Sequence, residues 1–139
     1  MTSTTPGTYR AILLDIEGTT TAISFVYEVL FPYARAGAEN YLRSHWGEED
    51  LRSVLGLFRE LVAQDQADAI EGVALIAADG EGEEAVIRSW VANIHWQMDS
   101  DRKTTALKAL QGRIWKAGYV DGTLKGQVYP DVPIAFKAW

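Results

Sequence analysis

The stretch from Ala11 to Thr21 reads AILLDIEGTTT, and it decides the fold that the sequence predicts. Its first four residues are continuously apolar and form a run too short for a helix, which is typical of a parallel strand covered on both faces. Asp15 follows the carboxyl end of that predicted strand. Because ligands of open parallel sheets bind in the crevice beyond these strand ends, Asp15 is a candidate functional residue.

The residues after this strand carry groups that suit phosphoryl chemistry. The first carboxylate can attack phosphorus and form an aspartyl phosphate, or it can bind Mg²⁺. Glu17 can protonate a leaving oxygen and later activate water. Gly18 permits the turn, and the hydroxyls and backbone N–H groups of Thr19, Thr20 and Thr21 can face an incoming phosphate. Two acids at a turn are also common without any catalytic role, and the Asp-x-Glu pair alone favours that simpler interpretation.

Most of the remaining sequence has helical periodicity. The predicted helices are 24–46, with a break or kink at Pro32, then 48–63, 83–98 and 103–117. Residues 66–82 are predicted to form a loop, and a final helix is expected with Asp131 as its N-cap and Pro133 in its first turn. A parallel strand needs neighbouring strands, and the sequence offers no convincing second one.

Several separate blocks of the sequence resemble one family. The motif LLDIEGTTT resembles the first motif of the haloacid dehalogenase superfamily of phosphotransferases, in which the second acid is usually Asp. Here the second acid is Glu17, and with Glu at that position the motif resembles that of the enolase-phosphatases, also called acireductone synthases. The blocks FPYAR (31–35), YLRSHW (41–46) and WQMDSDRKTTALKALQGRIW (96–115) agree with that family, so the resemblance runs from about Ala11 to Trp139.

The resemblance implies an α/β fold, a haloacid dehalogenase-like Rossmannoid core with an inserted helical cap. Of this fold the chain would hold the first core strand and the cap, and would therefore be mostly helical. The implied organisation is a flexible arm at 1–8, the strand and catalytic loop at 9–24, the cap at 25–127 and the start of the return to the core at 128–139. The second motif, the third-motif Lys and the later metal-binding acid would all be missing, which explains the missing strands.

The family reaction converts 2,3-diketo-5-methylthiopentyl-1-phosphate to an acireductone and phosphate in methionine salvage, with Mg²⁺ as cofactor. By resemblance, Asp15 and Glu17 are the catalytic residues and face the metal, while Gly18, Thr19 and Thr20 contact substrate. The ion would neutralise phosphate charge and polarise the diketone.

Two cations in the longest matching block are also candidate substrate ligands. Arg102 and Lys103 precede a predicted cap helix, where cations and backbone N–H groups suit a phosphorylated substrate. A simpler alternative is that Ser100 or Asp101 caps this helix while Arg102 and Lys103 are solvated.

Composition limits the partners of the protein. The 139 residues are 47% hydrophobic, enough for one domain with a core. With 19 acidic and 13 basic residues the net charge is −6, which argues against a general nucleic-acid or anionic-membrane binder. The sequence contains no cysteine, no signal-peptide pattern in Met1 to Thr8 and no apolar stretch long enough to span a bilayer. We therefore expect a cytoplasmic protein, monomeric if its core is complete.

Three functional hypotheses remain open from the sequence. The favoured one is an enolase-phosphatase, with little or no turnover by these 139 residues alone, because Mg²⁺ bound by an incomplete set of acids is held weakly. The second is a phosphatase of the same superfamily acting on another small phosphoester. The third is a non-catalytic helical fragment that associates through the exposed remainder of its core.

Overall fold

The computed structural model describes residues 9–139, so the predicted flexible arm at 1–8 lies outside the described residues. The described part of the chain is mostly helical. In chain order its elements are α1 (Ile23–Phe25), the π-helical segment η1 (Val26–Leu30), α2 (Phe31–Ser44), α3 (Glu49–Ala67), the 3₁₀ turn η2 (Asp79–Glu81), α4 (Glu83–Asp99), α5 (Thr105–Asp121) and α6 (Val132–Ala138).

The long helices agree with the predicted ones, since each has the apolar stripe that the sequence shows. The helix predicted for 48–63 is α3, which continues to Ala67, and those predicted for 83–98 and 103–117 are α4 and α5. The predicted loop corresponds to the connection between α3 and α4, which ends in η2. In α6 the N-cap is Asp131, as expected, although its side chain makes no capping hydrogen bond.

Pro32 disturbs the first long helix as predicted. A proline has no backbone N–H and its ring crowds the preceding turn, so a regular α-helix cannot pass through it unchanged. The chain remains helical from Ile23 to Ser44, but the turn just before the proline widens into η1, where the N–H of Phe31 donates to the carbonyl of Val26, five residues back. The irregularity is therefore a π-helical turn rather than a complete break.

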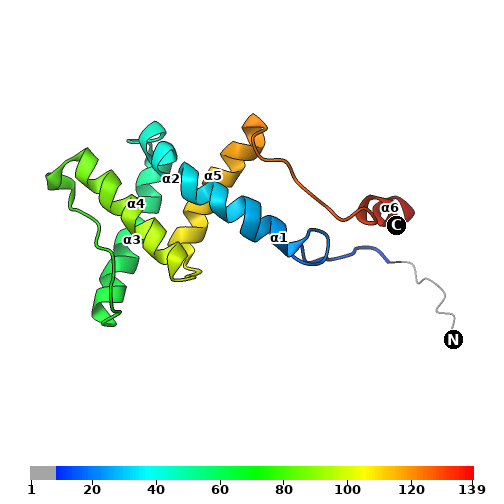
Figure 1. Ribbon diagram of the computed structural model, residues 1–139, viewed down its shortest axis with the longest axis horizontal. Coiled ribbons are helices and arrows are strands. Elements are labelled where there is room, and N and C mark those ends of the chain that lie inside the picture. Colours follow the sequence, from blue (N-terminus) through cyan, green and yellow to red (C-terminus); the bar gives the residue numbers. More distant parts are fainter. Residues whose placement is uncertain (1–8) are drawn as a thin grey trace.

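Four helices enclose one hydrophobic core. Figure 1 shows α2, α3, α4 and α5 gathered at one end of the molecule. Their buried apolar side chains are Ala34, Ala38 and Leu42 of α2, Leu51, Val54 and Phe58 of α3, Ile87, Trp90 and Ile94 of α4, and Ala106, Leu107, Leu110 and Ile114 of α5. All of them lie on the stripes that place apolar residues on one face of each helix.

Gly118 marks the closest approach between α5 and its neighbours. A Cβ atom at this position would lie 2.7 Å from the hydroxyl oxygen of Tyr33 and 2.9 Å from a methyl carbon of Leu124. Glycine is therefore the residue that lets α2 and the chain after α5 pack this closely. Gly122 then ends α5 in the left-handed conformation, with φ of 81°.

The strand predicted for Ala11 to Leu14 is wrong for this structure. Within residues 9–139 there is no strand, and an isolated bridge joins Glu17 to Thr21. Leu13, predicted to be buried, is 98% exposed. The physical reason is that a strand is stabilised by hydrogen bonds to neighbouring strands, and the described part of the chain supplies none. The helical part of the predicted fold is confirmed, whereas the α/β core is not formed here.

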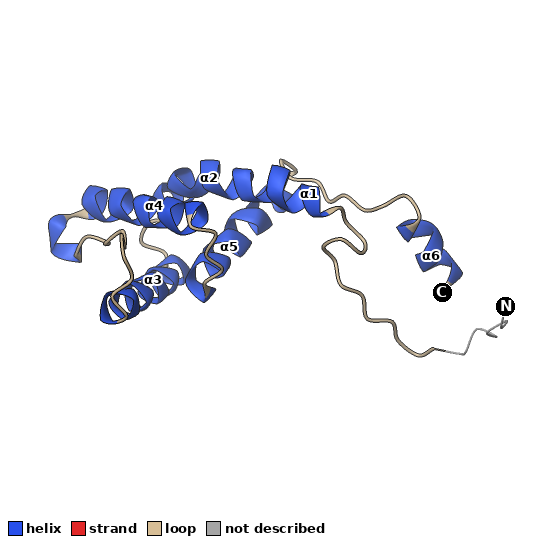
Figure 2. Cartoon of the chain, turned by 60° about the horizontal axis from the view of Figure 1, so that its bottom comes forward, coloured by secondary structure: helices blue, strands red, loops and turns tan. Residues whose placement is uncertain are grey.

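The segment between α5 and α6 contacts the loop of the acidic motif. Figure 2 shows α6 and the first described residues apart from the four-helix body. The N–H of Tyr129 donates to the carbonyl of Thr20 at 2.8 Å, and the hydroxyl of Thr21 donates to the carbonyl of Gln127 at 2.6 Å. The segment after α5 therefore returns to the motif loop. No helix of the described residues is long and apolar enough to cross a membrane.

Candidate active site

The acidic motif folds into a compact turn around the carbonyl of Ile16. That oxygen accepts hydrogen bonds from the N–H groups of Thr19, Thr20 and Thr21 at 3.2, 3.1 and 3.1 Å. Gly18 has a φ of 77°, a conformation that favours glycine, and its N–H donates to the carbonyl of Thr21 at 2.8 Å. The expectation that Gly18 permits this turn is met by its geometry.

The same hydrogen bonds leave the backbone donors of this loop facing inward. The N–H groups of Gly18, Thr19, Thr20 and Thr21 all donate to carbonyls of the loop itself. The hydroxyl of Thr20 also lies 3.4 Å from the carbonyl of Ile16. In this conformation the loop therefore does not offer the cradle of N–H groups that the sequence predicted for phosphate, and an incoming phosphate would need those bonds to rearrange.

Both motif carboxylates are exposed, and one of them borders a cavity. Glu17 lines a cavity of about 370 Å³ between the motif loop, the first long helix and the start of α5. Arg102 and Lys103, the two cations selected from a distant block of the sequence, line the same cavity, whereas Asp15 is not in its wall. The structure therefore brings three of the predicted site residues together.

The cavity at Glu17 has a charged end and an apolar wall. Its charged and polar residues are Glu17, Asp101, Arg102, Lys103, Lys108 and Gln111, and its apolar residues are Val26, Leu30, Phe31, Met98, Leu107 and Trp115. Phe31 and Trp115 stack with ring centroids 6.1 Å apart, and the indole nitrogen of Trp115 donates to the carbonyl of Leu30 at 2.8 Å. Such a wall suits a small molecule with an apolar part next to a charged one.

Arg102 is held by an acid that the sequence did not indicate. Its guanidinium donates two hydrogen bonds to the carboxylate of Asp65, at 2.6 and 2.8 Å, and lies 4.8 Å from the ring centroid of Trp96. The hydrogen bond to Asp65 is the main reason that the pKa of Arg102 is raised. Arg102 is thus neither solvated nor free to move to a substrate, and its main role here is to fix the turn before α5.

A buried chain of polar side chains fixes the other side of that turn. The amide of Asn93 donates to the carbonyl of Ala74 at 2.8 Å, the amide of Gln97 donates to Asn93 at 2.7 Å, and the hydroxyl of Thr104 donates to Gln97 at 2.6 Å. Thr104 also accepts from the N–H of Leu107, which makes it the N-cap of α5.

The capping role predicted for Ser100 or Asp101 is therefore wrong. Asp101 instead occupies the left-handed region with φ of 51°, where it turns the chain between α4 and α5. Lys103, between the anchored Arg102 and the capping Thr104, is exposed and forms no ion pair within residues 9–139. Its ammonium group is the predicted cation that remains available to an anion.

Several residues that build this site were missed in the sequence, although their positions gave a signal. Asp65 lies on the apolar stripe of α3, and Asn93 and Gln97 lie on that of α4, where polar residues are buried only when they are hydrogen bonded. Their burial at 4%, 0% and 0% exposure shows that each is part of the packed interior. Lys108, one turn into α5, was missed because nothing in the local sequence distinguishes it from a solvated lysine.

The magnesium site implied by the resemblance is incomplete in this part of the chain. Asp15 and Glu17 provide carboxylate oxygens, the ligands that Mg²⁺ prefers. Among residues 9–139, however, no group of three or more His, Cys, Asp or Glu side chains is placed to hold a metal ion. The donor chemistry fits the ion, but the number of donors does not make a closed site.

Comparisons with known proteins support the resemblance found in the sequence. No family model matches the chain. The enolase-phosphatase E1 of Aedes aegypti is 49% identical over 130 residues, which cover 94% of this chain and 12% of that protein. A Populus trichocarpa protein named "Probable bifunctional methylthioribulose-1-phosphate dehydratase/enolase-phosphatase E1" is 45% identical over 130 residues, covering 94% of this chain and 25% of that one.

A solved structure agrees with the fold described above. The crystal structure of the UTR4 protein of Saccharomyces cerevisiae matches with a TM-score of 0.60 at 28% sequence identity, covering 88% of this chain and 44% of that one. The chain is thus related to a class of enzymes, the hydrolases that remove phosphate groups. Within that class its relatives are the enolase-phosphatases E1, and the chain spans less than half the length of each protein named here.

Proposed function

We propose that this chain is the part of an enolase-phosphatase that carries the first carboxylate motif and the helical cap over the substrate. The observation that carries the proposal is the shared cavity of Glu17, Arg102 and Lys103, because it joins two sequence blocks that resemble the same family. The relatives named enolase-phosphatase E1 support this assignment, as does the name of the Populus trichocarpa relative, which combines a methylthioribulose-1-phosphate dehydratase with an enolase-phosphatase E1.

The proposed whole enzyme first enolises 2,3-diketo-5-methylthiopentyl-1-phosphate, so that a carbon next to the diketone loses its proton and a ketone oxygen gains one, and then removes phosphate to give an acireductone in methionine salvage. Asp15 attacks the phosphorus atom and forms an aspartyl phosphate, while Glu17 gives a proton to the leaving oxygen. Glu17 then takes a proton from water, whose oxygen attacks the aspartyl phosphate and releases inorganic phosphate. The apolar wall of the cavity would hold the methylthio end of the substrate, and Lys103 would face its phosphate.

Mg²⁺ is the proposed cofactor, with the carboxylate of Asp15 as a ligand and Glu17 facing the ion, because a Glu17 carboxylate bound to the metal could not carry the proton that it gives. When bound, it would supply positive charge that neutralises the phosphate oxygens. Further protein ligands have to come from residues other than those described, because the described acids and histidines form no closed site. We therefore propose that the 139 residues alone turn over little or no substrate.

A chimera tests the proposed function. In this protein, residues 9–139 replace the matching segment of the Aedes aegypti relative. The chimera is expected to release phosphate and to form an acireductone, followed by its ultraviolet absorbance, only in the presence of Mg²⁺. Asp15→Asn should abolish both products, while the isolated chain should form neither. Phosphate release without acireductone would instead support the phosphatase of another phosphoester, and activity that is unaffected by Asp15→Asn would contradict the proposed nucleophile.

A further inference from the structure

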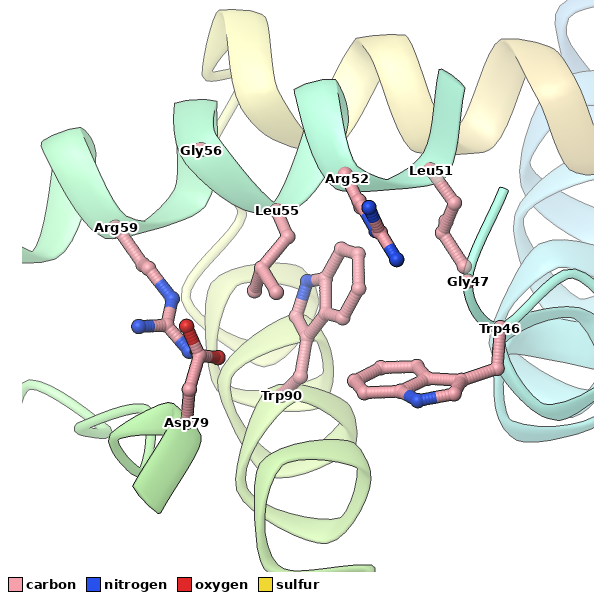
Figure 3. A pocket seen from close by; sticks show the side chains of 9 residues that line it. All are labelled: Trp46, Gly47, Leu51, Arg52, Leu55, Gly56, Arg59, Asp79 and Trp90. Atoms are coloured by element: carbon pink, nitrogen blue, oxygen red, sulfur yellow. The ribbon is translucent and has the colours of Figure 1, made fainter. Parts of the chain in front are cut away.

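A second cavity lies between α3, the turn before it and the middle of α4. Its volume is about 500 Å³, and it shares no residue with the cavity at Glu17. Figure 3 shows Trp46 entering from the turn between α2 and α3, Trp90 from α4, and Arg52 pointing from α3 toward the two indoles. Cavities of this size hold small molecules in many proteins.

Two indoles border this cavity, Trp46 with a partly exposed ring and Trp90 behind the surface with none of its ring exposed. Trp90 is fully buried and packs against Phe58, with ring centroids 5.4 Å apart and an interplanar angle of 67°. Trp46 is half-buried at the edge of the core. Planar rings bind indoles through stacked or edge contacts, which aliphatic groups of the same size cannot make.

The charges around this cavity favour an anion. Arg59 forms an ion pair with Asp79 at 2.8 Å and donates to the carbonyl of Ala77 at 3.2 Å, so its charge is already balanced. Arg52 forms no ion pair within the described residues. The lining therefore has one positive charge in excess, although the whole chain has a net charge of −6. A guanidinium suits a carboxylate or phosphate, and it also stacks on aromatic rings.

Two nitrogens in the walls of this cavity lack a partner. They are Nε of Arg59 and Nε1 of Trp90, the two buried side-chain nitrogens without a hydrogen bond in residues 9–139. Buried donors are normally satisfied, and both nitrogens are shielded as the side chains stand, so an acceptor from outside the chain reaches them only when a neighbouring side chain moves. The side chain of Leu55 lies beside the Trp90 nitrogen in Figure 3, and its rotation would expose that donor to the cavity.

We propose that this cavity is a binding site for a planar aromatic anion. The ring of the ligand lies against Trp46 and reaches the edge of Trp90 when Leu55 rotates, and its anionic group binds the guanidinium of Arg52. The site is separate from the acidic motif, and its occupation does not depend on the proposed enzymatic reaction. The ligand class is thus defined by three features that meet in one place, namely two neighbouring indoles, one unmatched positive charge and two unpartnered N–H groups.

The test measures the indole N–H signals of the chain by two-dimensional NMR. The five tryptophans give five signals, which single Trp→Phe substitutions assign. Titration with 2-naphthoate is expected to shift the signals of Trp46 and Trp90 in a saturable way, and to leave those of Trp115 and Trp139 in place. The neutral analogue 2-naphthalenemethanol should bind about tenfold more weakly because it cannot form the charge-assisted bond to Arg52. Acetate, which has no ring, should give no saturable shift.

Two variants test the location of the ligand. Arg52→Ala should weaken 2-naphthoate binding about tenfold and leave the binding of the neutral analogue unchanged. Gly56→Leu should abolish binding by filling the cavity, because a Cβ at Gly56 meets nothing within 4 Å and leucine is favourable in a helix. The matched control is Gly112→Leu on α5, where a Cβ also meets nothing within 4 Å and which lines neither of the two cavities described here.

The proposal is overturned if 2-naphthoate gives no saturable shift, or if it shifts Trp115 or Trp139 rather than Trp46 and Trp90. It also fails if Gly56→Leu binds 2-naphthoate as well as Gly112→Leu does, with both variants as helical as the parent chain by circular dichroism. Loss of binding in Gly56→Leu and Arg52→Ala, with normal binding in Gly112→Leu, supports it.

Discussion

Arg102 and Asp65 lie 37 residues apart in the chain, yet two hydrogen bonds of 2.6 and 2.8 Å join their side chains. This ion pair ties the turn before α5 to the end of α3. The carboxylate of Asp65 is almost completely buried and the guanidinium of Arg102 mostly so, with 5% and 21% of these side chains exposed. The block 96–115, the longest one that resembles the family, thus takes part in an ion pair that holds the backbone next to Lys103 in place.

Removing the buried partner should therefore destabilise the chain. Asp65→Ala leaves the guanidinium of Arg102 partly buried without its carboxylate, and the free energy of unfolding should fall by about 2–4 kcal/mol. Urea unfolding followed by circular dichroism measures this change. The control is Asp99→Ala, which breaks the exposed bridge to Arg35, where 66% of the Asp99 side chain is accessible, and which should cost less than about 1 kcal/mol. Equal losses in the two variants would contradict the assigned role of Asp65.

Thr104 supports the same turn from the other side. Thr104→Ala removes the N-cap of α5 and leaves the oxygen of Gln97, which is fully buried, without its donor. The free energy of unfolding should fall by about 1–3 kcal/mol, the sum of a lost cap and an unsatisfied polar group. Thr105→Ala is the matched control, because Thr105 is exposed at the first position of the helix, and it should change stability by less than about 0.5 kcal/mol.

The helical body could be predicted from the sequence because its causes are local. The stripe of apolar residues in α3 and the turn-forming residues around Gly80 and Gly82 act within a few positions of one another. Pro32 likewise acts through the N–H that it lacks, so a disturbance in that helix was predictable, although its form as a π-helical turn was not. Periodicity indicates where a helix must bury a face, but not how each turn is adjusted.

The remaining features depend on contacts between distant residues. The apolar run before Asp15 is a strand only if neighbouring strands pair with it, and the described chain provides none. The partner of Arg102 lies on another helix, so no local pattern could reveal it. The donors of the Thr19 to Thr21 loop could be expected to face a ligand, but whether they do depends on the path of the backbone around Ile16.

Gly118 and Gly112 offer opposite outcomes for the same substitution. Gly118→Ala places a Cβ 2.7 Å from the Tyr33 hydroxyl oxygen and should destabilise the chain by about 1–3 kcal/mol, because the side chains around it must move. Gly112→Ala adds a Cβ in open space within the same helix and should stabilise the chain by about 0.5–1 kcal/mol. Thermal unfolding distinguishes the two signs, and stabilisation by Gly118→Ala would show that the contact is not tight.

Glu84 provides a pH-dependent contact on the surface. Two hydrogen bonds from Arg43, at 2.8 and 3.1 Å, lower the pKa of Glu84 below its ordinary value. A carboxyl with a lowered pKa in the folded state stabilises the fold above its unfolded pKa, and this stabilisation is lost as the pH falls through the folded pKa. Arg43→Gln should raise the pKa of Glu84, as followed by a carbon NMR titration of its carboxyl group. Arg52→Gln, which removes a cation without an ion pair, should leave that titration unchanged.

Lys103 connects the anchored turn with the proposed reaction. It is exposed, lines the cavity with Glu17 and has no acidic partner within residues 9–139, so its charge is available to a phosphate. In the chimera, Lys103→Ala should lower kcat/KM about 10- to 100-fold, as expected for a lost hydrogen bond to a charged group. Lys116→Ala, within α5 and outside the cavity, should retain normal kinetics. If both variants are equally active, Lys103 does not contact the substrate and the cavity at Glu17 is not the place where the phosphate binds.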